Sequence, residues 1–186
     1  MKKAIFLDKD GTLIQNVPYN TDISRVVLTA GAAEALRQFR HAGYALVVIT
    51  NQSGIAHGYF DEEKFQALMQ QLCAMLPVPL DGWYCCPHHP EGTIPAYAIT
   101  CSCRKPQPGL ILQAAEKLGI DLSASWMIGD ILHDVEAGNR AGCRSALIIN
   151  GGETEWELSP LRQPVFCAEN LEEAAQHIIH HSITET

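Results

Sequence analysis

The stretch AIFLDKDGT, residues 4–12, decides the fold, because it joins four consecutive apolar side chains to the acidic sequence DKDG. A strand that is apolar at every position is typical of a parallel sheet covered by helices on both faces. Three more runs of this kind are ALVVIT, SWMIGD and SALIIN, at residues 45–50, 125–130 and 145–150. With the first run, expected to form a strand over residues 4–8, they predict a parallel sheet.

Segments of helical periodicity fill the intervals between these runs. Each has an apolar stripe at helical spacing, and several carry an end signal such as the cap Asp61 or the terminal Gly119. The expected helices cover residues 32–41, 61–75, 110–118, 135–141 and 171–180. This alternation predicts a doubly wound α/β sheet, and a length of 186 residues suits a single domain over residues 1–186. Only residues 77–107 interrupt the pattern.

Composition narrows the function classes. The formal net charge is −8, which argues against a nucleic-acid surface, because such surfaces need clustered Lys and Arg. No apolar run approaches the roughly 20 residues of a membrane span, and the basic start MKK precedes too short an apolar run for a signal peptide. We therefore expect a cytosolic protein that binds neither membrane nor nucleic acid. Without an obvious exposed apolar element, a monomer is the default.

Polar side chains follow the expected strands where parallel sheets bind ligands, at their carboxyl ends. Asp8 ends the first strand and Asp10 follows it, Thr50 ends the second, and Asp130 ends the strand expected over residues 125–130. Crowded carboxylates repel one another unless a cation lies among them, and an all-oxygen ligand set suits Mg²⁺. Hydroxyls and loop amides after Thr50 would bind phosphate oxygens, and Lys105, expected at a helix start, would neutralise a transferring group.

Other interpretations of the acidic residues are open at this point. In a calcium-binding EF-hand loop, a glycine comes sixth and a glutamate twelfth, whereas here Gly11 is fourth and Tyr19 twelfth. An isolated DxD sequence is often a cap or a turn, but these aspartates follow an apolar strand and face two further polar strand ends. Asp134 is either part of the site or a helix cap.

The motifs DKDGT, VVITNQSG, RKP and GDILHD resemble, in order and spacing, the four motifs of haloacid-dehalogenase (HAD) superfamily phosphatases. The resemblance spans nearly the whole chain and implies a Rossmann-like core without a large cap domain. It implies that Asp8 attacks phosphorus, and that Asp10 protonates the leaving oxygen and then activates water. Asp8, Asp130 and the backbone carbonyl of Asp10 would hold Mg²⁺, while Thr50 and Lys105 would bind the phosphoryl group.

A dense cysteine stretch precedes Lys105. Its C-x-H pair, Cys86 and His88, and its C-x-C pair, Cys101 and Cys103, supply the four ligands of a closed tetrahedral Zn²⁺ site. Reduced thiols or a Cys86–Cys101 disulfide are the alternatives. Four protein ligands leave no open position for catalysis, so the expected role is structural: a clip that fixes Arg104 and Lys105 towards the phosphate.

The remaining cysteines are not expected to bind the metal. Cys85 and His89 lie next to ligands and should point elsewhere. Cys73, Cys143 and Cys167 lie in apolar patterns and are expected in the core.

The zinc loop, residues 84–106, resembles a narrow branch of the superfamily, which comprises heptose bisphosphate phosphatases and histidinol-phosphate phosphatases. By this resemblance we expect the chain to remove the 7-phosphate of D-glycero-D-manno-heptose 1,7-bisphosphate, in the synthesis of nucleotide-activated heptose for lipopolysaccharide or other surface glycans. The alternative is histidinol phosphate or another small metabolite. Two positions depart from the heptose pattern: Ile131 stands where Lys is usual, and Asn16 where Asp is frequent.

The same resemblance places the substrate against small loops around residues 16–19 and 53–57 and the zinc loop, with Arg104 recognising a second phosphate or hydroxyls. The expected substrate-binding residues are Asn16, Tyr19, Thr50, Asn51, Gln52, Ser53, Arg104 and Lys105. Two rival classes are weaker. A polynucleotide 3′-phosphatase would need a basic groove, and a zinc-ribbon binding module would not need the carboxylates.

Overall fold

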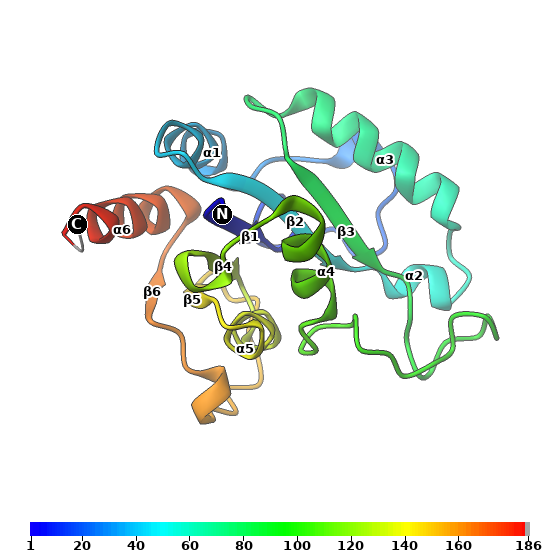
Figure 1. The fold of residues 1–186 in the computed structure, drawn as a ribbon. Coiled ribbons are helices and arrows are strands. Elements are labelled where there is room, and N and C mark those ends of the chain that lie inside the picture. Colours follow the sequence, from blue (N-terminus) through cyan, green and yellow to red (C-terminus); the bar gives the residue numbers. More distant parts are fainter. Residues whose placement is uncertain (185–186) are drawn as a thin grey trace.

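The described residues, 1–184 of a computed structural model, form a six-stranded parallel sheet in the order β3-β2-β1-β4-β5-β6 (Figure 1). The order reverses at β1, which pairs with β2 on one side and β4 on the other. The strands are β1 Ala4–Leu7, β2 Ala45–Asn51, β3 Gly82–Cys86, β4 Trp126–Gly129, β5 Arg144–Ile148 and β6 Phe166–Ala168. The expected doubly wound α/β architecture is confirmed.

Helices cover both faces of the sheet (Figure 1). The core on one face includes residues of α1, α3 and α6, and the core on the other includes residues of α4 and α5. The helices are α1 Ala32–His41, α2 Ser53–Ala56, α3 Glu62–Met75, α4 Gly109–Leu118, α5 Leu132–Ala141 and α6 Leu171–Thr184, with short 3-10 turns at Ile23–Arg25, Leu122–Ala124 and Pro160–Arg162. No described helix has the length and apolarity to cross a membrane.

The continuous apolar runs are explained by these two layers. Successive side chains of a strand point to opposite faces, so a strand covered on both sides needs an apolar residue at every position. In β1, Ile5 and Leu7 pack in the core beside α1, whereas Ala4 and Phe6 pack in the core beside α4. All four side chains are completely buried.

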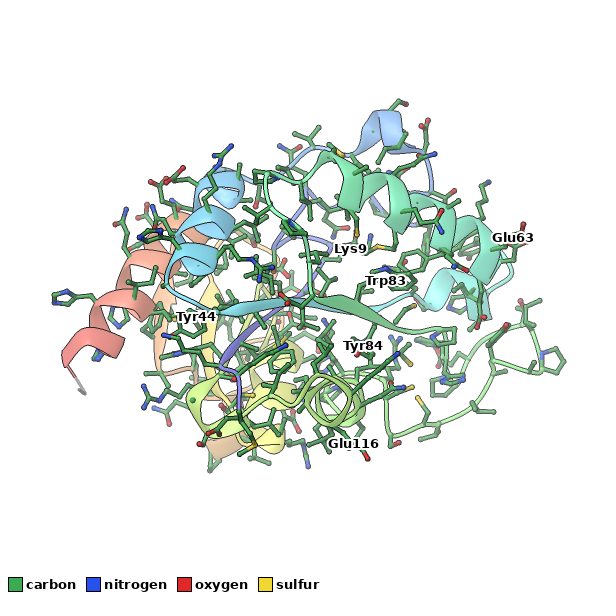
Figure 2. The ribbon with its side chains drawn as sticks, turned by 45° about the horizontal axis from the view of Figure 1, so that its top comes forward. Lys9, Tyr44, Glu63, Trp83, Tyr84 and Glu116 are labelled. Atoms are coloured by element: carbon green, nitrogen blue, oxygen red, sulfur yellow. The ribbon has the colours of Figure 1, made fainter. Side chains whose placement is uncertain are left out.

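Two strands were absent from the sequence prediction, β3 and β6, and both are edge strands of the described sheet. β3 has the sequence GWYCC, and its first four residues are half-buried, so it lacks the unbroken apolar run of a central strand. Figure 2 shows Trp83 and Tyr84 on opposite sides of this strand, and they pack against different cores. The segment that interrupts the helix–strand pattern therefore contains an edge strand leading into the cysteines.

Several helix ends agree with their sequence signals, and other details differ. The Asp61 carboxylate accepts a hydrogen bond from the Lys64 amide at 2.8 Å and caps α3, and Gly119 ends α4 with a φ of +67°. Helix α5 begins at Leu132, three residues before the expected start. Cys167 was expected in the core but is exposed, because the short strand β6 lies at the sheet edge. Cys73 is half-buried and Cys143 is buried.

Candidate active site

A buried lysine lies between two aspartates at the carboxyl ends of the central strands. The ammonium of Lys105 is 2.5 Å from Oδ1 of Asp8, which directly follows β1, and 2.6 Å from Oδ1 of Asp134 in α5. It also donates a hydrogen bond to the Ile49 carbonyl at 3.1 Å. Burial disfavours the ammonium, but the carboxylates of Asp134 and Asp8 outweigh this effect and raise the pKa of Lys105. The lysine is therefore held as a charged group.

The sequence suggested that Lys105 starts a helix, but it does not. Helix α4 begins only at Gly109, since Pro106 and Pro108 restrict the backbone before it. The position of Lys105 is fixed by Asn51 at the end of β2. The Asn51 side-chain amide donates to the Lys105 carbonyl and accepts from the Lys105 amide, both at 3.1 Å. Asn51, expected to bind substrate, thus joins two motif segments that are far apart in the sequence.

Three buried carboxylates, Asp8, Asp130 and Asp134, offer oxygens that lie within 4.8 Å of one another. Burial raises the pKa of Asp8 to about 8, with Lys105 acting in the opposite direction and the neighbouring carboxylates adding to the rise. Burial, followed by the charge of Asp134, raises the pKa of Asp130 to about 6. Such crowding favours a bound cation, and oxygen ligands at this spacing fit Mg²⁺.

The carboxylate of Asp130 lies in a gap that only glycines leave open. A Cβ at Gly11 or at Gly152 would come within 2.1 Å of Oδ2 of Asp130. Gly11 also has a φ of +92°, which favours glycine. The Thr12 hydroxyl approaches the other carboxylate oxygen at 3.4 Å. Any side chain at positions 11 or 152 would therefore displace the carboxylate.

Asp134, whose role the sequence left open, has two contacts. One oxygen forms the ion pair with Lys105, and the other accepts a hydrogen bond from the Ile131 amide at 3.3 Å, at the start of α5. The residue is completely buried. It is thus both a helix cap and the second partner of the buried lysine.

Asp10 lies in the loop after β1 and is more accessible, with 29% of its side chain exposed. The ammonium of Lys9 is 2.6 Å from Oδ1, and the side-chain amide of Gln52 donates to Oδ2 at 2.9 Å. The Gln52 amide is also 2.9 Å from the hydroxyl of Thr50, which is buried at the end of β2. The sequence did not predict that Lys9 contacts Asp10, although the position of Lys9 between the two aspartates indicated that it would lie near the site.

A cavity of about 260 Å³ opens beside Asp10. It brings together several side chains expected to bind substrate: Asn16, Tyr19, Asn51, Gln52 and Ser53. A second cavity, of about 460 Å³, extends past Asp130 and shares Asn16 with the first. Arg104 is half-buried and donates a hydrogen bond to the His88 carbonyl at 3.2 Å, so its guanidinium contacts the backbone at one of the expected zinc ligands.

The four expected zinc ligands, Cys86, His88, Cys101 and Cys103, form a compact cluster. Their ligand atoms lie within 4.8 Å of one another. The three sulfurs are 3.1 to 3.5 Å apart, and Nδ1 of His88 is 3.3 Å from the Cys103 sulfur. These separations are too long for a disulfide and are close to the edges, about 3.8 Å, of a tetrahedron around zinc. The donor set therefore fits Zn²⁺.

The neighbours of these ligands point elsewhere, as expected. Cys85 packs against the core on the opposite face of the sheet from Cys86, and the ring of His89 lies 5.0 Å from that of His57. Beyond the cluster, the loop is attached to α2. The Ala56 carbonyl accepts hydrogen bonds from the amides of Thr93 and Ile94, at 2.8 and 2.9 Å. The loop is therefore anchored at its base by the cluster and near its tip by a helix beside the cavity.

With this geometry established, the similarity to known proteins is informative. The family model for HAD-hydrolase-like proteins matches residues 102–174. A D-glycero-beta-D-manno-heptose-1,7-bisphosphate 7-phosphatase of Pasteurella multocida is 46% identical over 156 residues, which are 82% of this chain and 84% of the relative. The chain belongs to the HAD-like phosphatase family. The expected family and enzyme class, a phosphoric monoester hydrolase, are confirmed.

Solved structures of HAD-like phosphatases share the whole fold. One from Mesorhizobium loti has a TM-score of 0.84 at 33% identity and covers 97% of this chain and 87% of its own. D,D-heptose 1,7-bisphosphate phosphatase from B. bronchiseptica, solved with magnesium and phosphate, has a TM-score of 0.77 at 27% identity, covering 96% and 99%. In line with this match, the described residues contain no insertion that forms a large cap domain.

Proposed function

We propose that the chain is a Mg²⁺-dependent phosphatase that removes the 7-phosphate of D-glycero-D-manno-heptose 1,7-bisphosphate. The observation that carries this proposal is the buried pair of Lys105 and Asp8, 2.5 Å apart beside Asp130, in a chain 46% identical to a named 7-phosphatase. In the proposed reaction, Asp8 would be the nucleophile and Lys105 the cation that binds the phosphoryl group, and their closeness supports this assignment. We propose that residues 1–186 act as one domain, of which 185–186 lie outside the described residues.

In the first half of the reaction, a carboxylate oxygen of Asp8 forms a bond to phosphorus as the bond from phosphorus to the leaving oxygen breaks. Asp10 gives its proton to that oxygen, so the products are an aspartyl phosphate, the free alcohol and the Asp10 carboxylate. Asp8 suits the attack because it directly follows β1 and its side chain is only 11% exposed.

In the second half, Asp10 takes a proton from water as the water oxygen bonds to phosphorus and the bond from phosphorus to Asp8 breaks. Phosphate and the free Asp8 carboxylate result. The Thr50 hydroxyl and the Lys105 ammonium bind phosphoryl oxygens throughout and balance their negative charge. Asp10, with its partly exposed carboxylate beside the cavity, is placed to exchange a proton with both leaving group and water.

Two metals fit the chain in different roles. Asp8, Asp130 and the backbone carbonyl of Asp10 would hold Mg²⁺, which supplies positive charge that offsets the crowded carboxylates and the phosphate. Cys86, His88, Cys101 and Cys103 would hold a structural Zn²⁺, and a reducing cytosol would keep these thiols available as ligands.

The substrate would lie in the cavity beside Asp10. Asn16, Tyr19 and Ser53 offer polar and aromatic contacts to a hydroxylated carbon chain, and Arg104 would contact the phosphate that is not cleaved. The side chain after Asp130 is Ile131, which offers no charge for the sugar phosphate. Recognition would therefore depend on Arg104 and the loop amides.

The substrate is tested by comparing kcat/KM for the heptose bisphosphate with that for histidinol phosphate. We expect a preference of at least about 100-fold for the heptose, because a phosphate contact with Arg104 is worth a few kcal/mol. A preference for histidinol phosphate would overturn the assignment. Asp8→Asn should abolish turnover of both with the fold intact. Asp121→Asn, at a half-buried position that caps the 3-10 turn Leu122–Ala124, is the matched control.

A further inference from the structure

Lys9 is a buried cation that the reaction scheme does not use. It stands between the two aspartates of the DKD sequence, and only 2% of the residue is exposed. Its ammonium is 2.6 Å from Oδ1 of Asp10 and 5.7 Å from the ring centre of Phe65 in α3. Figure 2 shows Lys9 beneath α3, on the face of the sheet that this helix covers. A buried ammonium needs a partner, and here the partner is the carboxylate proposed as acid and base.

The second oxygen of Asp10 is held as well. The Gln52 side-chain amide donates to Oδ2 at 2.9 Å, and the same nitrogen lies 2.9 Å from the Thr50 hydroxyl. Gln52 is itself buried, so its amide has little freedom to turn. Asp10 therefore has a donor on each carboxylate oxygen, one from its own loop and one from the end of β2.

These two contacts matter because Asp10 lies on a loop and is partly exposed. A freely rotating carboxyl would spend much of its time away from the leaving oxygen, whereas proton transfer needs an oxygen-to-oxygen separation of roughly 2.6–3.2 Å. Holding the Asp10 side chain in place before the reaction therefore raises the rate of proton transfer.

Charge adds a second effect. When Asp10 gives up its proton, negative charge develops on its carboxylate, and the Lys9 ammonium is already in place to stabilise it.

We propose that Lys9 is a positioning residue, assisted by Gln52, that orients Asp10 and stabilises its carboxylate as the proton leaves. This inference rests on the proposed function, because it assigns Lys9 to the acid step of that reaction. Lys9 also borders the cavity, so a direct contact with the substrate is the alternative that an experiment must separate.

The test compares two leaving groups in the Mg²⁺-loaded enzyme. The leaving group of the heptose bisphosphate is a sugar alkoxide, which needs a proton, whereas the leaving group of p-nitrophenyl phosphate is a stable phenolate, which does not. For Lys9→Met we expect kcat/KM to fall about 10- to 100-fold with the heptose substrate and less than about 3-fold with the aryl substrate. Lys9→Arg, which keeps the charge, should recover most of the loss.

Lys64→Met is the matched control, because Lys64 is an exposed lysine in the first turn of α3 and its loss should change neither rate. A thermal melt of each variant checks the fold. If Met at position 9 destabilises the protein, Lys9→Gln, which keeps a donor without the charge, serves in the same comparison.

Equal losses of Lys9→Met with the two substrates, or no loss with either, would overturn the role of Lys9. Asp10→Asn separates this failure from failure of the proposed function. If Asp10→Asn spares the aryl substrate but Lys9→Met does not discriminate, only the inference about Lys9 is wrong. If Asp10→Asn itself fails to discriminate in kcat/KM, which reports only the first half of the reaction, Asp10 is not the acid and the proposed mechanism is wrong together with the inference about Lys9.

Discussion

Replacing Lys105 by methionine should destabilise the metal-free protein strongly. The lysine is 4% exposed, and its ammonium lies 2.5 and 2.6 Å from two carboxylates, of which Asp134 is completely buried. Methionine fills a similar volume but leaves both carboxylates without their cation. Breaking a buried ion pair in this way costs about 3–5 kcal/mol. We expect the free energy of unfolding to fall by that amount at about pH 8 in the presence of a chelator.

The loss should shrink as the pH is lowered, because the Asp8 carboxyl can then take up a proton. Burial raises the pKa of Asp8 to about 8 although Lys105 lowers it, so without Lys105 this pKa should rise further and Asp8 should be neutral at low pH in the variant. The difference between wild type and variant should therefore be smaller at about pH 5.5 than at about pH 8. Turnover should fall about 100- to 1,000-fold, as for removal of one preorganised donor to a developing charge.

Urea unfolding followed by circular dichroism measures these differences, and phosphate release measures turnover. Lys117→Met, the same change at an exposed site on α4, is the control and should have little effect. Adding Asp134→Asn to the Lys105 variant should recover part of the stability, since one unpaired carboxylate is removed. A loss below about 1 kcal/mol, or one that is equal at both pH values, would refute the importance of the buried ion pairs.

Two further predictions concern the metals. Purified protein should contain close to one zinc per chain. Cys101→Ser should lower the zinc content and the melting temperature, and should lower kcat/KM about 10- to 100-fold, whereas the control Cys167→Ser, at an exposed cysteine, should change none of these. An unchanged zinc content in Cys101→Ser would contradict the proposed ligand set. Burial raises the pKa of Asp8 to about 8 and that of Asp130 to about 6, so the stability they contribute without metal is complete below about pH 4 and is lost as the pH rises to about 8. Mg²⁺ competes with those protons, so the rise in melting temperature on adding Mg²⁺ should be larger at about pH 7.5 than at about pH 5.5, and a pH-independent rise would show that these carboxyls do not bind the ion.

The sequence was sufficient to predict the central sheet, because its strands are covered on both faces and are apolar at every position. It was insufficient for β3, an edge strand in which Trp83 and Tyr84 are only half-buried. Cys167 was placed in the core for a related reason. An apolar residue type marks a buried site only when the strand around it is covered, and β6 lies at the other edge.

The candidate site was predictable where each residue ends a strand, as Asp8 and Asp130 do. What the sequence lacked were the contacts between side chains from distant segments. The carboxylate of Asp134 reaches Lys105 across 29 residues of sequence, and the amide of Asn51 reaches the same lysine across 54. These contacts depend on how the loops cross above the sheet, which no local pattern specifies.

The cluster of Cys86, His88, Cys101 and Cys103 brings the two ends of the loop together, and this has a consequence for how the loop and the active site can change. Residues 89–100 lie between the two ligand pairs, while Lys105 lies outside them and is held by Asn51. The intervening segment can therefore be lengthened, shortened or replaced without moving the lysine. In evolution or in protein design, one hydrolytic centre can thus be combined with new loop sequences and so be directed to other phosphorylated metabolites.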